Sequence, residues 1–579
     1  MKDHHRRKRN PTSRRSTLFC CTTSFLFSSL VLISFTFSTI RLFRVKEPFH
    51  PDADLPWPTQ PLEPQPNRDH DSWSRPPSAT MSIRETILMP DYALVFLNYP
   101  PSSRFYTERD LECVYFSAKS AQPRLSAPPL QVDQTELHGQ IVRCPLMPRG
   151  RTVSISVKPI GRIATNPSSN HRWDSLVYEA LIDRDNTTIV FLKGLNLRPE
   201  RLAEPSRFEC VYGWDFKRPK MLLTSDVVSV AQEIVRCRTP LSFLIGLNMK
   251  KVKDSVKVSV RVKGRRIFPS VARPGLRLEP KRKAPKRHQI CVCTMLRNQA
   301  RFLKEWVMYH TRIGVKRWFV YDNNSDDDIG TVIESLQSNN YNITRHVWPW
   351  IKAQEAGFAH CALRARSVCK WVGFIDVDEF FHLKLDQSLK DVIRRHSGPN
   401  NVGEIRTPCY SFGPSGLKKL PRQGVMVGYT CRLAARERHK SIVSPDALNS
   451  TLINVVHHFH LKQGFVAVSV DRTVMVINHY KYQVWEVFKE KFYRRVATFV
   501  SDWKEEQNVG SKDRAPGLGT KAVEPPDWSN RFCEVRDSNL RNWVLNKFAD
   551  RRTHLLPWQP EYELQKRQRR KRRRGRGYL

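Results

Sequence analysis

Short apolar strands alternate with amphipathic helices between residues 288 and 380, and this alternation constrains the fold more than any other feature. The expected buried strands are Ile290–Met295, Trp318–Tyr321 and Trp371–Ile375. Apolar residues at helical spacing separate them and predict helices at residues 301–314, 329–337 and 354–369. Strands that alternate with helices in this way predict a largely parallel α/β sheet.

Acidic residues stand at the carboxyl ends of two of these strands. Asp322 follows the strand at 318–321, and Asp376, Asp378 and Glu379 follow the strand at 371–375. Ligands of such sheets bind at the carboxyl ends of the strands, so these residues should face one crevice. Carboxylates there suit Mn²⁺ or Mg²⁺, which prefer oxygen ligands and can neutralise the charge on a leaving diphosphate. The placement after a buried strand predicts a metal site, although an Asp-x-Asp pair alone is a weak signal.

Residues 86–270 contain one internal repeat. Val95–Leu97, Leu111–Tyr115 and Ile141–Pro145 of the first copy recur as Val190–Leu192, Phe208–Tyr212 and Ile234–Cys237. Each copy closes on an alternating strand, which indicates a sheet with one buried face. We therefore expect two small β-sandwich units, with disulfides Cys113–Cys144 and Cys210–Cys237. These units fit carbohydrate binding through Trp173 or Trp214, a spacer or a dimer surface, but a buried core position is the expected role of either Trp.

The amino-terminal residues predict membrane anchorage. Residues 19–40 form an uncharged run long enough to span a bilayer, and seven Lys or Arg residues precede it within the basic tail at 1–18. The charge bias keeps this tail in the cytosol, so we expect a single-pass type II protein with a proline-rich stem at residues 41–85. A cleaved signal peptide is the alternative interpretation.

Cysteine content and sequons agree with a lumenal body. Eleven of the 13 cysteines follow the expected span, where disulfides can form. Asn186, Asn342 and Asn449 begin glycosylation sequons. Asn323 also begins one, but its place beside Asp322 predicts that it lies in the substrate site and stays unmodified.

The net charge of +42 invites a nucleic-acid interpretation, which its distribution opposes. Much of the excess lies in short runs, the last of them within the basic tail at residues 560–579. Such runs are typical of solvated segments and bind any polyanion, including acidic glycans and lipid headgroups. We therefore expect no nucleic-acid partner.

Several motifs together resemble those of family 92 glycosyltransferases, the plant group similar to galactan synthases. They are Cys291–Asn298, Trp306–Asp322, Gly373–Phe380, Phe412–Gly416, His439–Val443 and Asn478–Tyr482. The resemblance covers roughly residues 288–510, within an expected catalytic domain at 288–550. It implies a GT-A fold, a UDP-sugar donor, usually UDP-galactose, dependence on Mn²⁺ and inverting transfer that forms a β-linkage.

The resemblance also implies roles for individual residues. Asp376 would lie near the ribose and metal, Asp378 would ligate the metal directly, and Asp322 would hold the uridine. Lys440 would meet the diphosphate, and either His457 or His479 would complete the metal site. Simpler interpretations are a salt-bridged Glu379, a surface Lys440 and a core-facing histidine.

An inverting transfer requires a general base within reach of the acceptor hydroxyl. Glu404 and Glu437 are candidates, and the sequence does not choose between them. The glycines of Phe412–Gly416 suggest an acceptor-side loop, since they allow the backbone to approach a sugar closely. The favoured function is a Golgi galactosyltransferase that extends a cell-wall or glycoprotein glycan, with a homodimer among its expected partners. The alternative is a lectin-like or scaffold membrane protein without activity.

Overall fold

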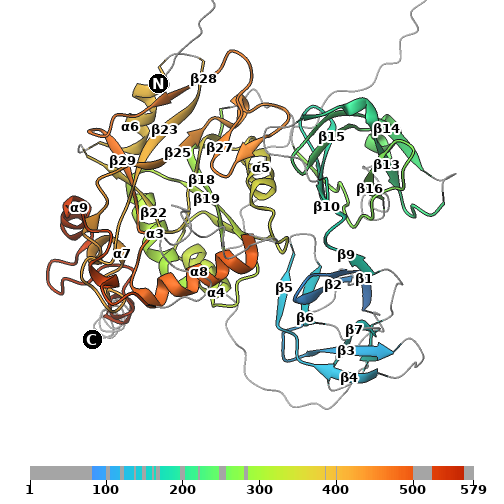
Figure 1. Ribbon diagram of the computed structural model, residues 1–579, viewed down its shortest axis with the longest axis horizontal. Helices are drawn as coiled ribbons and strands as arrows, with labels where there is room; N and C mark the ends of the chain where they lie inside the picture. Colours follow the sequence, from blue (N-terminus) through green and yellow to red (C-terminus); the bar gives the residue numbers. More distant parts are fainter. Residues whose placement is uncertain are drawn as a thin grey trace, which may run out of the picture. The chain divides into compact units, whose positions relative to one another are not determined.

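The computed structural model describes residues 81–98, 105–117, 123–135, 139–146, 151–158, 162–164, 170–195, 202–218, 222–246, 256–278, 285–384, 387–398, 401–499 and 524–565 (Figure 1). The expected tail, span and most of the stem (residues 1–80) lie outside these ranges, as does the basic run from 566. Among the described residues, none of the helices combines the length and apolar character needed to cross a bilayer. The chain divides into two compact units, Met1–Pro76 and Pro77–Leu579, and all features below belong to the second.

The first β-rich module is a sandwich of two sheets, confirming that prediction for the first repeat. Its strands are β1 (Ser82–Leu88), β2 (Tyr92–Asn98), β3 (Leu111–Ser117), β4 (Pro123–Ala127), β5 (Gln131–Gln134), β6 (Gln140–Pro145), β7 (Arg151–Val157), β8 (Arg162–Ile163) and β9 (Asn170–Arg172). One sheet has the order β5-β6-β2-β1-β9 and the other β4-β3-β7-β8. The disulfide Cys113–Cys144 joins β3 to β6, as expected.

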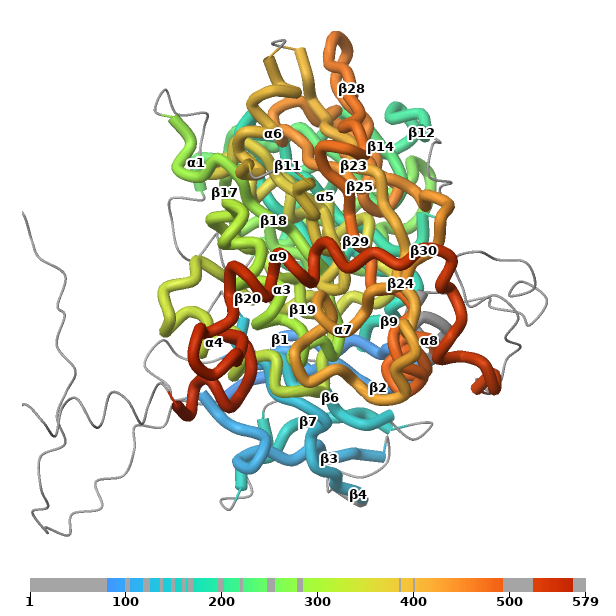
Figure 2. The backbone as a smooth tube through the Cα atoms, turned by 90° about the vertical axis from the view of Figure 1, so that its left-hand side faces the viewer, coloured from blue at the N-terminus to red at the C-terminus, as the bar shows by residue number. Residues whose placement is uncertain are grey.

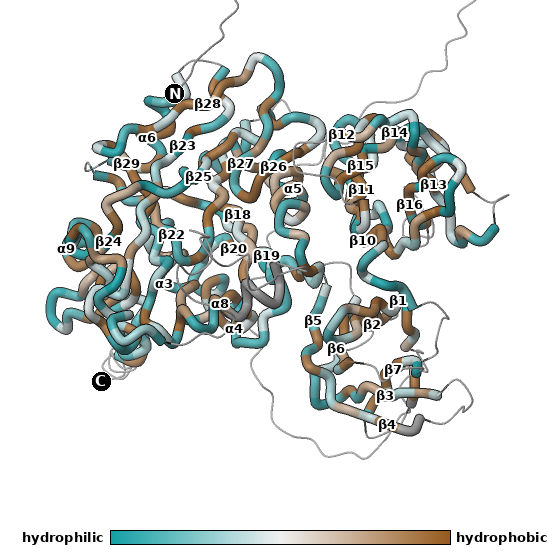
Figure 3. The backbone as a smooth tube through the Cα atoms, in the orientation of Figure 1, coloured by the Kyte–Doolittle hydropathy of each residue, from teal (hydrophilic) through white to brown (hydrophobic). Residues whose placement is uncertain are grey.

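The second module repeats this arrangement. Its elements are β10 (Leu176–Ile182), β11 (Thr187–Lys193), β12 (Leu202–Ala203), β13 (Phe208–Gly213), β14 (Leu223–Ala231), β15 (Ile234–Arg238), α1 (Leu241–Gly246), β16 (Lys257–Val262) and β17 (Leu276–Arg277). The long strand β14 pairs with both β13 and β15, so it replaces the separate β4 and β5 of the first module. The expected disulfide Cys210–Cys237 is present. Hydrophobic residues recur along the strands of both modules (Figure 3).

The α/β domain follows, from β18 to α9. Its first half contains β18 (His288–Leu296), α3 (Ala300–Ile313), β19 (Arg317–Asp322), α4 (Ile329–Ser338), β20 (Ile343–Val347), α5 (Gln354–Ala365), β21 (Cys369–Phe374) and β22 (Glu379–Leu383). Its second half contains α6 (Leu389–His396), β23 (Val402–Ser411), α7 (Val425–Gly428), β24 (Cys431–Arg432), β25 (Glu437–Val443), β26 (Asn454–Val455), β27 (His458–Phe459), β28 (Val466–Ser469), β29 (Met475–His479), α8 (Trp485–Phe499), β30 (Val535–Arg536) and α9 (Asn539–Phe548).

The main sheet has the order β20-β19-β18-β21-β25-β23-β29-β22, with β28 beside β23. The expected parallel arrangement holds for β20, β19, β18 and β21. β25 then runs antiparallel to β21, so the prediction of a largely parallel sheet is correct only for the first half. The helix expected at 354–369 ends at Ala365, because the chain turns there so that β21 can begin at Cys369.

Alternate residues of β18 face opposite layers. Ile290 and Val292 pack in the cluster that contains α3, whereas Cys291 and Cys293 pack in the cluster that contains α5. Both cysteines form disulfides on that second face: Cys291 bonds to Cys369 at the start of β21, and Cys293 bonds to Cys361 in α5. The sequence did not reveal these pairings. Cys291–Cys369 joins the neighbouring strands β18 and β21, and Cys293–Cys361 fixes β18 to the helix α5.

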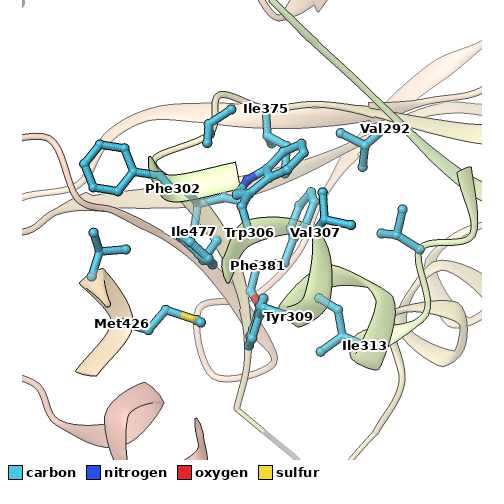
Figure 4. Packing of buried hydrophobic residues seen from close by; sticks show 14 of the residues in the cluster. Val292, Phe302, Trp306, Val307, Tyr309, Ile313, Ile375, Phe381, Met426 and Ile477 are labelled. Carbon is cyan, nitrogen blue, oxygen red and sulfur yellow. The ribbon is translucent and has the colours of Figure 1, made fainter. Parts of the chain in front are cut away.

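The main core lies beneath α3. Trp306, Val307 and Tyr309 of this helix face Val292, Phe381 and Ile477 of the sheet (Figure 4). The Tyr309 hydroxyl donates to the carbonyl of Phe381 at 2.6 Å, so this buried polar group is satisfied. The helix α9, near the carboxyl end of the described chain, returns to the same layer, where Trp543 contacts Tyr309 with ring centroids 5.7 Å apart (Figure 2).

Both modules share a second core with the α/β domain. Trp173, 5% exposed, stacks on Trp350 with ring centroids 5.5 Å apart, and Phe96 and Tyr178 pack against the same ring. Trp173 is therefore a core residue, as expected, and is not available to stack on a sugar. Trp214 is 57% exposed, so the expectation of a core position is wrong for this residue.

Candidate active site

The predicted strand ends meet at one edge of the sheet. β18 lies between β19 and β21, and it pairs with both in parallel. Asp322, the last residue of β19, pairs with Leu296 of β18, and Asp376 follows β21 at nearly the same level. Strands spaced about 4.8 Å apart place these two acidic positions roughly 10 Å from each other. The topology thus brings together the residues that the sequence placed at strand ends.

Asp376 lies in the turn from β21 to β22 and faces His457. The Nε2 atom of His457 is 3.5 Å from Oδ2 of Asp376, and His457 stands in the tight turn between β26 and β27. Burial would raise the pKa of Asp376, but the nearby His457 and Lys440 hold it well below its usual range. The Asp376 carboxyl group is therefore ionised at physiological pH, as a metal ligand must be.

Asp378 is flanked by an imidazole and an ammonium group. His479 Nε2 lies 3.5 Å from Oδ2 of Asp378, and Lys491 of α8 forms an ion pair with the same oxygen. Burial opposes the charge on Asp378, yet Lys491 and His479 hold its pKa well below the ordinary value. Burial likewise disfavours the imidazolium, but Asp378 raises the pKa of His479 well above its usual range.

Glu379 is fully buried and connects Asp376 with Lys440. Its Oε2 atom accepts the backbone N–H of Asp376 at 3.0 Å, and its Oε1 atom lies 2.6 Å from Nζ of Lys440. Burial lowers the pKa of Lys440, but Glu379 and Asp376 raise it above its ordinary value. Lys440 is therefore a buried ammonium inside the cluster, and the interpretation of it as a surface charge is wrong.

The donor set fits a divalent cation of the Mn²⁺ or Mg²⁺ class. Ligand atoms of Asp376, Glu379 and His457 lie within 4.8 Å of one another, and so do those of Asp378, Glu379 and His479. Within the described residues, Nδ1 of His457 and both ring nitrogens of His479 are buried and make no hydrogen bond of ordinary geometry. Carboxylates with one imidazole are ligands that such ions accept.

Asp322 is engaged by its own domain. The side chain is 1% exposed; its Oδ1 atom accepts the backbone N–H of Ser325 at 3.0 Å, and Oδ2 accepts from Arg345 at 2.8 Å. Arg345 also donates to Asp133 of the first module at 2.7 Å. The uridine-binding role of Asp322 stays a prediction, and the contacts assign it a role in shaping the loop after β19.

The two general-base candidates differ in access. Glu404 is fully buried in β23, where Arg406 donates to it at 3.0 Å and Ser441 donates to its other oxygen. Despite burial, bonds from His458, Arg406 and Ser441 lower the pKa of Glu404 to about 2. Glu437 is 26% exposed beside Lys481 and His479, 3.0 and 3.6 Å away. The geometry therefore favours Glu437 as the carboxylate that can reach an acceptor.

Two further expectations concern the loop Phe412–Gly416 and the sequon at Asn323. A side chain at Gly413 would meet the carbonyl of Arg531 at 2.6 Å, so the close approach that this glycine permits is to the chain itself. Asn323 donates its amide to the carbonyls of Trp348 and Trp350 at 2.8 and 2.9 Å. This side chain is 8% exposed, which explains physically why its sequon should remain unmodified.

Sequence reasoning missed Lys491, Lys481 and Arg345. Lys491 lies 113 residues from Asp378 along the chain, and nothing in its helical context distinguishes it from the exposed Lys489. Lys481 follows His479 by two residues, so its place on the same strand end was a usable signal. Lys440, Lys481 and Lys491 together surround the carboxylates with positive charge, which suits a ligand that carries phosphate.

A parallel strand edge with carboxylates, imidazoles and ammonium groups defines a class of site for a cation and a phosphate-bearing ligand. The sequence profile described as Glycosyltransferase family 92 matches residues 286–509. A family 92 protein of Ricinus communis is 59% identical over 96% of this chain and 100% of its own length. One from Oryza sativa subsp. japonica is 49% identical, covering 95% of each chain. One from Arabidopsis thaliana is 46% identical, covering 85% of this chain and 87% of its own.

The chain therefore belongs to glycosyltransferase family 92, and membership identifies it as a glycosyltransferase. Solved structures with weaker likeness include S. aureus TarS 1–349 in complex with UDP, at 14% identity and a TM-score of 0.22, covering 38% of this chain and 68% of that one. Another is the mannosyltransferase PcManGT from Pyrobaculum calidifontis in complex with GDP-Man and Mn²⁺, at 11% identity and a TM-score of 0.22, covering 39% and 69%.

Proposed function

We propose that this chain transfers galactose from UDP-galactose to a glycan acceptor, with inversion to a β-linkage, through a GT-A-type domain that depends on Mn²⁺ or Mg²⁺. The observation that carries the proposal is the cluster of Asp376, Asp378 and Glu379 with His457 and His479 at the strand ends. The donor and stereochemistry come from the family resemblance to galactan synthases, and the metal from the donor set.

In this proposal the cluster binds the diphosphate end of the donor. Asp376, Asp378 and one or both of His457 and His479 would hold the cation, which when bound offsets the charge that develops on the departing diphosphate. Lys440 pairs with Glu379 at 2.6 Å, and Glu379 in turn accepts the backbone N–H of Asp376, so Lys440 helps to fix the carboxylates in their positions. Lys491 pairs with Asp378 and would supply a second positive charge toward phosphate.

Glu437 is proposed as the base that accepts the proton of the acceptor hydroxyl. Despite burial, hydrogen bonding and charge from His479, together with Lys481, hold the pKa of Glu437 well below its usual range, so the carboxylate is ready to accept. A low pKa also weakens it as a base, so orientation of the hydroxyl is its larger contribution. The carboxylate of Glu404 is fully buried and cannot reach an acceptor.

We further propose that the protein is a single-pass type II protein of the Golgi membrane, with the catalytic domain in the lumen and a possible homodimer. The five disulfides among the described residues support an oxidising compartment. The alternative of an inactive lectin-like or scaffold protein is disfavoured, because the cluster keeps its paired acidic and imidazole groups.

The test is a transfer assay with residues 80–579, UDP-galactose, MnCl₂ and galacto-oligosaccharide acceptors. Elongated product and UDP release are expected, and both should disappear when EDTA removes the metal. Absence of transfer and of UDP release across a panel of sugar nucleotides would refute the proposed activity. Activity that survives EDTA would refute the metal dependence alone.

A further inference from the structure

The two β-rich modules carry the same arginine at equivalent places in their repeats. Arg143 in β6 and Arg236 in β15 each precede the cysteine that closes the disulfide of their module. The two side chains are buried, 4% and 3% exposed, and both reach beyond their module. A buried guanidinium requires partners for its donors, so its contacts indicate its purpose.

Arg143 holds the loop that follows β19. It donates to the backbone carbonyls of Asn324 and Ser325 at 3.3 and 3.4 Å and pairs with Asp326 at 3.0 Å. The neighbouring strand β5 adds Asp133, which accepts from Arg345 while Arg345 also binds Asp322. The first module therefore bonds directly to residues 324–326 and reaches Asp322 only through Arg345, at the predicted nucleotide side of the site.

Arg236 holds a different loop of the same site. Its Nε atom donates to the carbonyl of Ser450 at 3.0 Å. Close by, Gln232 donates to the carbonyl of Asn454 at 2.7 Å and accepts the backbone N–H of Asn454 at 3.2 Å. The segment 450–454 leads directly into the turn that carries His457, the partner of Asp376.

We propose that Arg143 and Arg236 are positioning residues, one from each repeat, and that each holds one loop of the active site. Arg143 sets the loop 322–326 for the nucleotide, and Arg236 sets the loop 450–454 so that His457 faces Asp376. On this proposal each β-rich module supports one loop of the catalytic centre, whatever else its surface binds. That these loops serve a nucleotide and a metal ion rests on the proposed function. That the two arginines hold the loops in place does not depend on it.

Substitution of either arginine should leave a folded protein. In the variant Arg143→Met, Asp326 still has its ion pair with Arg297 at 3.1 Å. In the variant Arg236→Met, Asp183 still has its ion pair with Arg366 at 3.1 Å. Neither change strands a buried charge, which is the usual cause of severe loss. Lys158→Met is the matched control, because it removes a cation of the first module whose pairing with Glu112 is exposed and 3.6 Å long.

The test is amide hydrogen exchange of the full-length chain, read by mass spectrometry on peptides that cover the two loops. We expect Arg143→Met to speed exchange about tenfold in 322–326 and not in 450–454, and Arg236→Met to do the reverse. Lys158→Met should change neither, and Arg143→Lys should give an intermediate rate, because an ammonium lacks the forked donors. Equal response of both loops, or of neither, to each variant would overturn the proposal.

Binding provides the second readout on the same variants. Arg143→Met should weaken UDP binding about tenfold with MnCl₂ affinity retained, and Arg236→Met should weaken MnCl₂ binding about tenfold. If the loops loosen while both affinities stay within about twofold of wild type, the positioning role is wrong. A wild-type chain that binds neither UDP nor Mn²⁺ would refute the proposed function, and the exchange pattern would still decide on the loops.

Discussion

The ion pair between Lys491 and Asp378 makes a quantitative prediction about metal affinity. The ammonium group contacts the carboxylate oxygen that faces His479, so a cation that coordinates this oxygen must compete with Lys491. Replacement Lys491→Met removes this competition and leaves Asp378 beside His479. We therefore expect the variant to bind Mn²⁺ more tightly than wild type does.

The magnitude follows from charge and exposure. Two unit charges about 4 Å apart interact by roughly 4 kcal/mol at an effective dielectric constant of about 20. The Lys491 side chain is 22% exposed on a helix surface, so water screens it and it can move aside. We take about 1–2 kcal/mol as the share of the Lys491–Asp378 interaction that a cation must overcome, a value between those of exposed and of buried ion pairs. This corresponds to a gain in affinity of roughly 5- to 30-fold.

The assay is titration with MnCl₂ in the absence of nucleotide, with free Mn²⁺ followed by electron paramagnetic resonance. Lys489→Met is the matched control: it removes the same charge two residues away on α8, from an exposed side chain. Its affinity should stay within about twofold of wild type at physiological salt, where exposed charges are screened. Unchanged or weaker Mn²⁺ binding by Lys491→Met would show that Asp378 is not a metal ligand or that Lys491 does not oppose the cation.

Three other predictions concern activity, pH and thiols. Asp378→Asn should lower transfer at least about a hundredfold with little change in the thermal midpoint, because it removes a metal ligand and no packing; a wild-type rate would exclude Asp378 from the site. Burial raises the pKa of Glu305 from 4.5 to about 7, so the folded state holds a proton that the unfolded state releases, and stability falls by up to about 3 kcal/mol between those pH values. The thermal midpoint of wild type should therefore fall relative to that of Glu305→Gln, which does not titrate, from pH 5 to pH 7, and a constant difference would contradict this pKa. Cys409 is the buried free thiol among the described cysteines, so residues 80–579 should react with one equivalent of a thiol reagent only after denaturation, and Cys409→Ser should abolish that reaction.

Local pattern was enough to predict the strand ends. Alternation and apolar runs place β18, β19 and β21, and parallel strands necessarily bring Asp322 and Asp376 to one edge of the sheet. The repeat likewise predicted two sandwiches with their disulfides, since each cysteine occupied an equivalent strand in both copies. In these cases the information lies within a few residues of the position concerned.

Long-range partners could not be predicted in the same way. Asp133 lies 212 residues from Arg345, and Arg236 lies 214 residues from Ser450, so no local pattern records those bonds. The repeat showed that Arg143 and Arg236 are equivalent, but it did not show that their side chains leave the module. The antiparallel half of the main sheet was missed for a related reason, since strand direction there depends on connections that periodicity does not encode.

The two disulfides of β18 have a consequence for how the chain matures. Cys291 and Cys293 point to the same side of one strand, about 7 Å apart, while their partners Cys361 and Cys369 lie close together in sequence. Four such thiols permit three pairings, of which the folded protein uses one. A wrong pair that forms early must be corrected by thiol–disulfide exchange before the native sheet is complete, and this exchange takes seconds to hours and is faster with an isomerase. The yield of correctly paired protein should therefore rise with the supply of oxidative folding catalysts in the cell that makes it.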